Sequence, residues 1–252
     1  MDGKEEIWSQ EFVVRQYHLD FQGRIAPTYL CRMLQEAATH HAESLNLSSE
    51  RLRKDGLTWV LSKFHLKMEG NPKWPKWNEK IRVETWRSGI ERIFVLRDYR
   101  VLNSDGEVLG IATSFWAILD IKERRPVMIP ASVLEQIPAE QHRIFESKMG
   151  KIVQKSREDH KKTFQVGQRD LDDNQHTNNV SYISWALEAV PQNVWSQRRL
   201  TELEIIYRIE TFFGDPIVSL TQEDSDPEQA VFLHRIIGQA DREVAQGRTR
   251  WI

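Results

Sequence analysis

The chain repeats itself at a constant spacing of 152 residues, from Glu11 to Thr163, and this repeat limits its possible folds more than any other feature. The stretch EFVVRQYHLDFQGRIAPTYLCRMLQEA, which begins at Glu11, aligns without a gap with TFQVGQRDLDDNQHTNNVSYISWALEA, which begins at Thr163. The identical residues are Phe12/Phe164, Val14/Val166, Gln16/Gln168, Leu19/Leu171, Asp20/Asp172, Glu36/Glu188 and Ala37/Ala189. A long alignment without gaps indicates a duplicated unit.

Two further pairs of segments follow in the same order. LTWVLSKFHLKMEG, from Leu57, resembles LTELEIIYRIETFFG, from Leu200. SDGEVLGIATSFW, from Ser104, resembles ADREVAQGRTRWI, from Ala240. Each pair is weak alone, but their common order predicts two copies of one fold.

Each copy has the same predicted order of elements: an alternating strand, a turn-rich loop, a helix and then several strands. Apolar residues recur at helical spacing at Leu30, Met33, Leu34 and Ala37 in the first copy, and at Ile183, Ala186, Leu187 and Val190 in the second. Pro27 suits a first helical turn, Pro191 would close the second helix, and NSDG (103–106) is a plausible hairpin turn. This order predicts an α+β fold in which an antiparallel sheet surrounds one central helix.

We divide the chain into an N-terminal copy (1–120), a linker (121–160) and a C-terminal copy (161–252). The linker contains three prolines and a dense mixture of charges, which is typical of a connector with room for a short helix. Its KERR run (122–125) could touch an acidic partner, but a solvated charge run is the default interpretation.

The composition excludes several classes of protein. A net charge of −2 provides no global basic field for nucleic acid. The single cysteine, Cys31, can form neither an intramolecular disulfide nor a multi-cysteine zinc site, and its helical context favours a buried apolar role. His40 and His41 point in two directions on a helix, which argues against a metal site. The polar start and the lack of an apolar run of about 18 residues predict a cytoplasmic protein without a membrane span.

The run LDDNQHTNN, from Leu171 to Asn179, is unusually polar for a helix start. The first copy has Gln22 opposite Asn174 and Arg24 opposite His176. Capping by Thr177, Asn178 or Asn179 explains part of the run, but it does not explain His176. If the run served only to start a helix, both copies would be expected to carry similar residues.

The residue types in this run suit acyl chemistry. Asp can orient an imidazole or an amide, His can donate a hydrogen bond or take a proton near pH 7, and Asn offers a fixed donor and acceptor. Free N–H groups at the start of the following helix would suit a carbonyl oxygen that gains negative charge. The sequence has no serine elbow, phosphate-binding glycine loop or metal-ligand spacing. An acyl group, and a thioester in particular, attacked by water fits best.

The pattern Asp-x-Asn-x-His-x-Asn-Asn resembles the signature of the acyl-acyl-carrier-protein (acyl-ACP) thioesterases of plants and bacteria. The resemblance covers nearly the whole chain and includes RRPVMIP (124–130), IIYRIET (205–211) and the following GD (214–215). It implies a tandem hot-dog fold, hydrolysis of fatty acyl-ACP in fatty acid biosynthesis, and acyl carrier protein as the partner. From the resemblance, together with the charge, the hydropathy and the lack of metal-ligand spacing, we expect no cofactor, metal, nucleic acid or membrane partner.

The resemblance also implies the site residues. Asp172, Asn174, His176 and Glu210 are the expected catalytic residues, and we expect weaker substrate contacts from Asn179 and Thr211. The plant enzymes carry a cysteine directly after the catalytic acid, whereas this chain has Thr211 there. We therefore expect direct attack by water, with Glu210 or His176 as the base.

Glu210 has a simpler interpretation as well. Strand alternation would place it on one face with Ile206 and Arg208, where it could form a salt bridge with Arg208. Its counterpart in the first copy is Lys67, so the acid is specific to the second copy. That asymmetry favours a catalytic role.

Two other functions remain open at this stage. A hot-dog enoyl-thioester hydratase also uses Asp and His near a helix start, but usually with His one residue later, after Asn-Pro. A non-catalytic acyl-thioester binding protein would keep the fold without turnover. We expect the first copy to hold the acyl chain, and Arg24 or the RLRK run (51–54) to be candidate carrier contacts, although solvated surface is their simpler interpretation. The chain would be a monomer or a homodimer.

Overall fold

A computed structural model describes residues 7–70, 72–137, 142–145, 151–152, 157–224 and 229–252. The chain divides into two compact units. The first contains residues 1–64 and 71–147, and the second contains residues 65–70 and 148–252.

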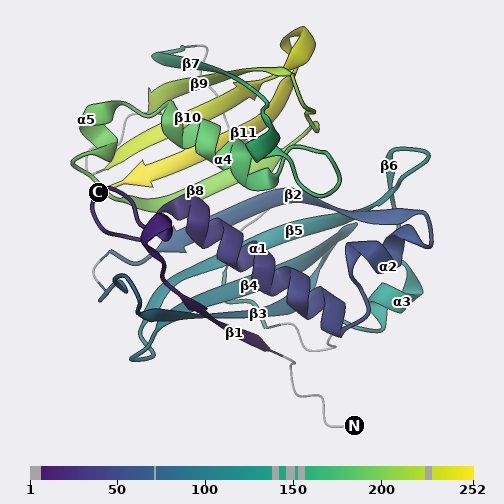
Figure 1. Cartoon of the computed structure of the whole chain (residues 1–252). Helices are drawn as coiled ribbons and strands as arrows, with labels where there is room; N and C mark the ends of the chain where they lie inside the picture. Colours follow the sequence, from purple (N-terminus) through teal and green to yellow (C-terminus); the bar gives the residue numbers. More distant parts are fainter. Residues whose placement is uncertain (1–6, 71, 138–141, 146–150, 153–156, 225–228) are drawn as a thin grey trace. The chain divides into compact units, whose positions relative to one another are not determined.

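The first unit is an antiparallel sheet with one long helix. Its elements are β1 (Trp8–Val13), a 3-10 turn η1 (Gln16–His18), α1 (Pro27–Ser44), α2 (Ser49–Arg53), β2 (Leu57–Met68), β3 (Lys80–Glu91), β4 (Phe94–Asn103), β5 (Val108–Asp120), β6 (Arg125–Val127) and α3 (Ala131–Leu134). The strand order is β1-β3-β4-β5-β2, with β6 paired to β5, and the last residues of β2 count with the second unit. Figure 1 shows α1 lying across the strands of its own unit.

The second unit has the same architecture. Its elements are β7 (His160–Gln165), a 3-10 turn η2 (Gln168–Asp170), α4 (Asn179–Glu188), α5 (Gln192–Trp195), β8 (Leu200–Tyr207), β9 (Pro216–Asp224), β10 (Ala230–Ile237), a 3-10 turn η3 (Gln239–Asp241) and β11 (Glu243–Trp251). The strand order β7-β9-β10-β11-β8 reproduces that of the first unit when β7 is matched to β1 and β8 to β2.

The repeat spacing seen in the sequence holds at the level of single elements. Trp8 and His160 begin the first strands, Gln16 and Gln168 the 3-10 turns, and Pro27 and Asn179 the helices, each pair 152 residues apart. The prediction of two hot-dog units in tandem is therefore confirmed.

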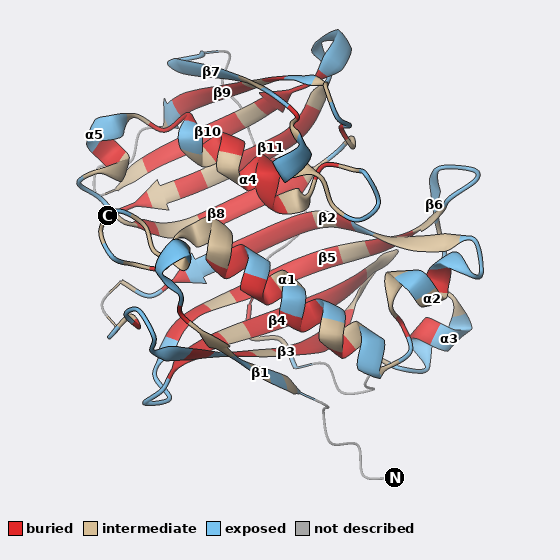
Figure 2. Ribbon diagram, viewed as in Figure 1, coloured by how far each residue is buried: buried red, intermediate tan, exposed pale blue. Residues whose placement is uncertain are grey.

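The predicted helix faces form much of each core. Leu30, Met33, Leu34 and Ala37 are buried on α1, and Ile183 and Ala186 are buried on α4, as are Val190 just beyond its end and many strand residues (Figure 2). Leu187 is only half-buried. The two helices differ in length, because α1 has 18 residues and α4 has 10.

The first part of the predicted linker folds with the first unit. It forms β6 and α3, and its residues Ile129 and Val133 pack with Leu47, Val95 and Ile118 in one apolar cluster. Residues 138–141, 146–150 and 153–156 of the linker lie outside the described residues. In the described part of the chain, no helix is both long enough and apolar enough to cross a membrane.

Candidate active site

The loop that precedes α4 is shaped by Asp172. Its Oδ1 accepts hydrogen bonds from the backbone N–H groups of Asn174, at 2.9 Å, and of His176, at 3.1 Å. The backbone N–H of Asp172 in turn donates to the carbonyl of His176 at 2.8 Å. Gln175 adopts a positive φ of 63°, which closes the turn. The carboxylate thus fixes where Asn174 and His176 lie.

The first copy builds the same loop with different side chains. Oδ1 of Asp20 accepts from the backbone N–H groups of Gln22, at 2.9 Å, and of Arg24, at 3.0 Å. Gly23 takes the positive φ, at 71°, that Gln175 takes in the second copy. The aspartate is therefore shared scaffold. The loop accepts either a His or an Arg at its last position.

The structure brings two predicted catalytic residues together. Nδ1 of His176 lies 3.5 Å from Oε2 of Glu210, and a backbone bridge between His176 and Phe212 joins their segments. The edge of the imidazole meets the Phe212 ring, with ring centroids 5.3 Å apart and planes at 81°. The side chains of His176 and Glu210 are 42% and 32% exposed, so a substrate can reach both.

The expected strand position of Glu210 is wrong. β8 ends at Tyr207, and Glu210 lies in the irregular segment that follows, where strand alternation does not apply. Arg208 forms an ion pair with Glu243, at 3.0 Å, and donates to Oε1 of Gln246 at 2.8 Å. These two contacts occupy the guanidinium that the simpler interpretation assigned to Glu210.

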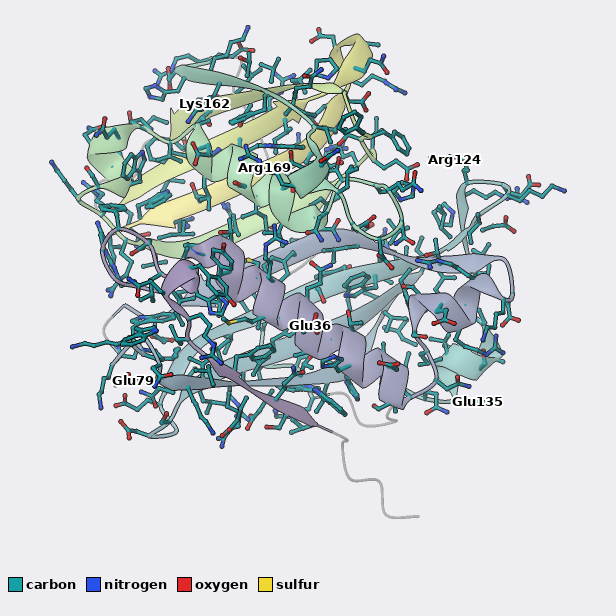
Figure 3. The ribbon with its side chains drawn as sticks, in the orientation of Figure 1. Glu36, Glu79, Arg124, Glu135, Lys162 and Arg169 are labelled. Atoms are coloured by element: carbon teal, nitrogen blue, oxygen red, sulfur yellow. The ribbon has the colours of Figure 1, made fainter. Side chains whose placement is uncertain are left out.

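The remaining predicted residues lie in different environments. Asn174 is exposed on the loop, while Asn179 begins α4 and its carbonyl accepts from the Tyr207 hydroxyl at 3.1 Å. Thr211 is only 1% exposed, and its hydroxyl is bonded within the protein. Arg169, labelled in Figure 3, is an exposed cation on η2, directly before the loop.

Most of the N–H groups at the start of α4 are already used. Oδ1 of Asn178 caps the helix by accepting from the backbone N–H of Val180 at 2.9 Å. The backbone carbonyl of Asn178 accepts from the backbone N–H of Ser181. The N–H of Asn178 itself donates to the carbonyl of Asp170 at 2.7 Å. Side chains of the loop are therefore better placed than the helix start to bind a carbonyl oxygen.

The structure also bears on a cysteine nucleophile and on a metal site. Cys31 is buried, as predicted, and burial raises the pKa of its thiol to about 12, which keeps it protonated. Within the described ranges, no three His, Cys, Asp or Glu side chains gather to hold a metal ion.

The sequence pointed to no role for Phe212 or Tyr182 near the site, and only to a capping role for Thr177. Phe212 packs on the imidazole of His176, and the other two bind the Thr211 hydroxyl or carbonyl. A usable signal was present for the two hydroxyl residues. The first copy has Ile25 and Leu30 at their positions, so the change from apolar to hydroxyl accompanies the change from Arg to His.

The two scaffold aspartates allow a matched test. Asp172→Asn keeps an oxygen that can accept both backbone bonds, so we expect kcat for the expected thioester hydrolysis to fall less than tenfold. Asp172→Ala loses both bonds, which should lower the free energy of unfolding by about 1–3 kcal/mol and reduce kcat more strongly. Asp20→Ala should lose similar stability while activity is retained. Urea denaturation and steady-state kinetics measure both; a large kcat loss in Asp172→Asn would instead place the carboxylate charge in the chemistry.

Comparison with known proteins identifies the family. Residues 5–137 match the acyl-ACP thioesterase N-terminal domain, and residues 153–252 match the acyl-ACP thioesterase C-terminal domain. An oleoyl-acyl carrier protein thioesterase of Arabidopsis thaliana is 29% identical over 276 residues, covering 97% of this chain and 75% of the relative. A palmitoyl-acyl carrier protein thioesterase of Gossypium hirsutum is 30% identical, covering 97% of this chain and 63% of the relative.

Solved structures of acyl-ACP thioesterases share the fold of this chain. The crystal structure of an acyl-ACP thioesterase from Bacteroides thetaiotaomicron superposes with a TM-score of 0.88 at 26% identity, covering both chains completely. The 12:0-ACP thioesterase of Umbellularia californica, at 24% identity, shares the fold with a TM-score of 0.85 over 98% of this chain and 97% of its own. The two family domains together span almost the whole sequence. This chain therefore belongs to the acyl-ACP thioesterase family.

Proposed function

We propose that this protein hydrolyses the thioester of fatty acyl-ACP and releases a free fatty acid, which ends chain elongation. The observation that carries the proposal is the 3.5 Å contact between His176 and Glu210 beside the start of α4. The first copy has Arg24 and Lys67 at these positions, two cations that cannot form such a pair. The chemistry is thus assigned to the second copy.

Glu210 acts as the general base in the proposed reaction. Its carboxylate takes a proton from water as the water oxygen bonds to the carbonyl carbon of the thioester. The tetrahedral intermediate then collapses, the carbon–sulfur bond breaks, and the proton passes from Glu210 to the departing thiolate. A thiol is a good leaving group, with a pKa near 8.5 for a simple cysteine, so this step needs little acid assistance.

His176 and Asn174 position and polarise the carbonyl. Nδ1 of His176 faces Glu210, and the Nε2–H on the other edge of the ring is the donor proposed for the substrate oxygen. The exposed Asn174 lies on the same loop and offers an amide donor to the developing negative charge. Asp172 acts through the backbone, because its Oδ1 holds the N–H groups of both residues.

The first copy is proposed to hold the acyl chain. It keeps the loop and the helix but lacks the His–Glu pair, and its long helix α1 carries a continuous apolar face.

The partner is proposed to be acyl carrier protein. Of the candidate carrier contacts, Arg51 lies on α2 and pairs with Asp55 at 2.8 Å.

Thiol release tests this function directly. The purified protein is incubated with acyl carrier protein loaded with saturated and unsaturated chains of different length, and with the matching coenzyme A esters. We expect free thiol and free fatty acid from at least one acyl-ACP, and release at least a hundredfold slower for His176→Ala. Hydration of an enoyl thioester without thiol release would indicate a hydratase, and binding without turnover would indicate a binding protein.

A further inference from the structure

Three buried hydroxyl groups form a continuous chain of hydrogen bonds beneath the candidate active site. Oγ1 of Thr177 donates to the carbonyl of Thr211 at 2.9 Å, and Oγ1 of Thr211 donates to Oγ1 of Thr177 at 2.8 Å. The Tyr182 hydroxyl lies 2.9 Å from Oγ1 of Thr211. The three residues are buried, with exposures of 6%, 1% and 3% for Thr177, Thr211 and Tyr182.

The direction of each bond follows from the number of protons. Thr177 uses its one hydroxyl proton on the carbonyl, so it can only accept from Thr211. Thr211 has then used its own proton, so Tyr182 is the donor to it at 2.9 Å, and the Ile209 carbonyl, at 3.4 Å, is a second and longer acceptor of the same proton. Burial raises the pKa of Tyr182, which keeps this donor protonated. The chain therefore runs from Tyr182 through Thr211 and Thr177 to the backbone, with every hydroxyl proton placed.

This chain joins the segments that carry the two catalytic groups. Thr177 directly follows His176, and Thr211 directly follows Glu210. The backbone N–H of Thr177 also donates to the Thr211 carbonyl at 3.0 Å, so the segments are tied by main chain and side chain together. Tyr182 extends the tie to α4, which begins three residues earlier.

The first copy provides an internal control. The matching residues there for Thr177 and Tyr182 are Ile25 and Leu30, both apolar and both buried. A hot-dog unit can thus be built with apolar side chains at these two positions. Burying three hydroxyls brings a desolvation cost that only complete hydrogen bonding offsets. The hydroxyls occur in the copy that has the His–Glu pair.

We propose that Thr177, Thr211 and Tyr182 are positioning residues that set the distance between His176 and Glu210. The inference deepens the proposed hydrolysis and rests on it. A catalytic contact of 3.5 Å depends on where both backbone segments lie, and a misplacement of about 1 Å can lower a rate about a hundredfold. On this account Thr211 acts through its neighbour and does not touch the substrate.

Kinetics of Thr211→Val and Thr211→Ser test the proposal. Valine keeps the shape of threonine without the hydroxyl, so we expect kcat to fall about 10- to 100-fold while KM stays within about twofold. Serine restores the hydroxyl and should return kcat to within about threefold of the wild type. In a Glu210→Gln background the valine change should cause little further loss, because there is no longer a working pair to align. Thr249→Val is the matched control, since Thr249 is a fully buried threonine of the same unit that binds His234.

A spectroscopic readout makes the test independent of turnover. In nitrogen-15 spectra of the imidazoles, Thr211→Val should shift the His176 signals towards those of Glu210→Gln, while Thr249→Val should leave them in place. Four results would overturn the proposal: unchanged kcat and unchanged His176 signals in Thr211→Val, a change in KM alone, no rescue by serine, or a loss that simply adds to that of Glu210→Gln. A wild type that releases no thiol would refute the hydrolysis itself, and the His176 signals would still decide whether the hydroxyl chain aligns the pair.

Discussion

Glu210→Gln is expected to lower kcat for acyl-ACP hydrolysis about a thousandfold with little change in KM. Glutamine has nearly the same shape as glutamate but cannot take a proton from water. Because Glu210 lies outside the β8 ladder and is about one-third exposed, the substitution should leave the free energy of unfolding within about 0.5 kcal/mol. Single-turnover thiol release, with the enzyme saturating and in excess over acyl-ACP, measures the chemical step separately from substrate binding.

The matched control for this variant is Lys67→Gln, at the corresponding position of the first copy, which should keep wild-type activity. His176→Gln should lower kcat about a hundredfold, less than Glu210→Gln, because it removes polarisation and leaves the base in place. The opposite order of the two losses would transfer the role of base to His176. Equal activity of Glu210→Gln and the wild type would remove Glu210 from the mechanism.

The fold could be predicted because the repeat makes the two halves constrain each other. The apolar pattern around Ile183 is a weak sign of a helix by itself. A similar pattern occurs 152 residues earlier, around Cys31, and this agreement supports the prediction of a helix in both copies. Apolar positions were predicted well because burial of one helix face follows directly from its spacing. The repeat also pairs Asp20 with Asp172, and the structure shows the same two backbone hydrogen bonds at each.

The predicted position of Glu210 depended on where strand β8 ends. The alternation that placed Glu210 beside Arg208 fails because β8 stops at Tyr207, three residues too early. No local signal in YRIET marks that end, since Tyr, Ile and Thr all favour strands. Glu210 meets His176 only because the irregular segment bends back to pair Phe212 with it.

The hydroxyl chain illustrates a different limit. Thr177, Tyr182 and Thr211 are ordinary residues one at a time, and their relation depends on contacts between segments up to 34 residues apart. Asn174 and His176 stand out because the first copy has Gln22 and Arg24 at their positions. Thr177 and Tyr182 differ from the first copy as well, since their counterparts Ile25 and Leu30 are apolar.

The second large effect concerns stability in acid and comes from His234. This residue of β10 is fully buried, and its ring nitrogens bind the hydroxyls of Thr221, at 3.0 Å, and Thr249, at 2.8 Å. Burial lowers its pKa from 6.5 to about 3. Between these values the unfolded chain binds a proton that the native protein does not, so stability is lost as the pH falls. We expect this one group to lower the free energy of unfolding by about 2 kcal/mol between pH 7 and pH 5.

Urea denaturation of the wild type and of His234→Gln at pH 7 and pH 5 measures this contribution. Glutamine can still bind a threonine hydroxyl but does not titrate, so the variant should lose about 2 kcal/mol less than the wild type over this interval. A residual loss should remain in the variant from His41, whose pKa burial and the nearby Arg97 and Arg87 also lower to about 3. An equal loss in wild type and variant would show that His234 has the same pKa in the native and unfolded states. In that case hydrogen bonds to the two threonine hydroxyls would offset the effect of burial on its pKa.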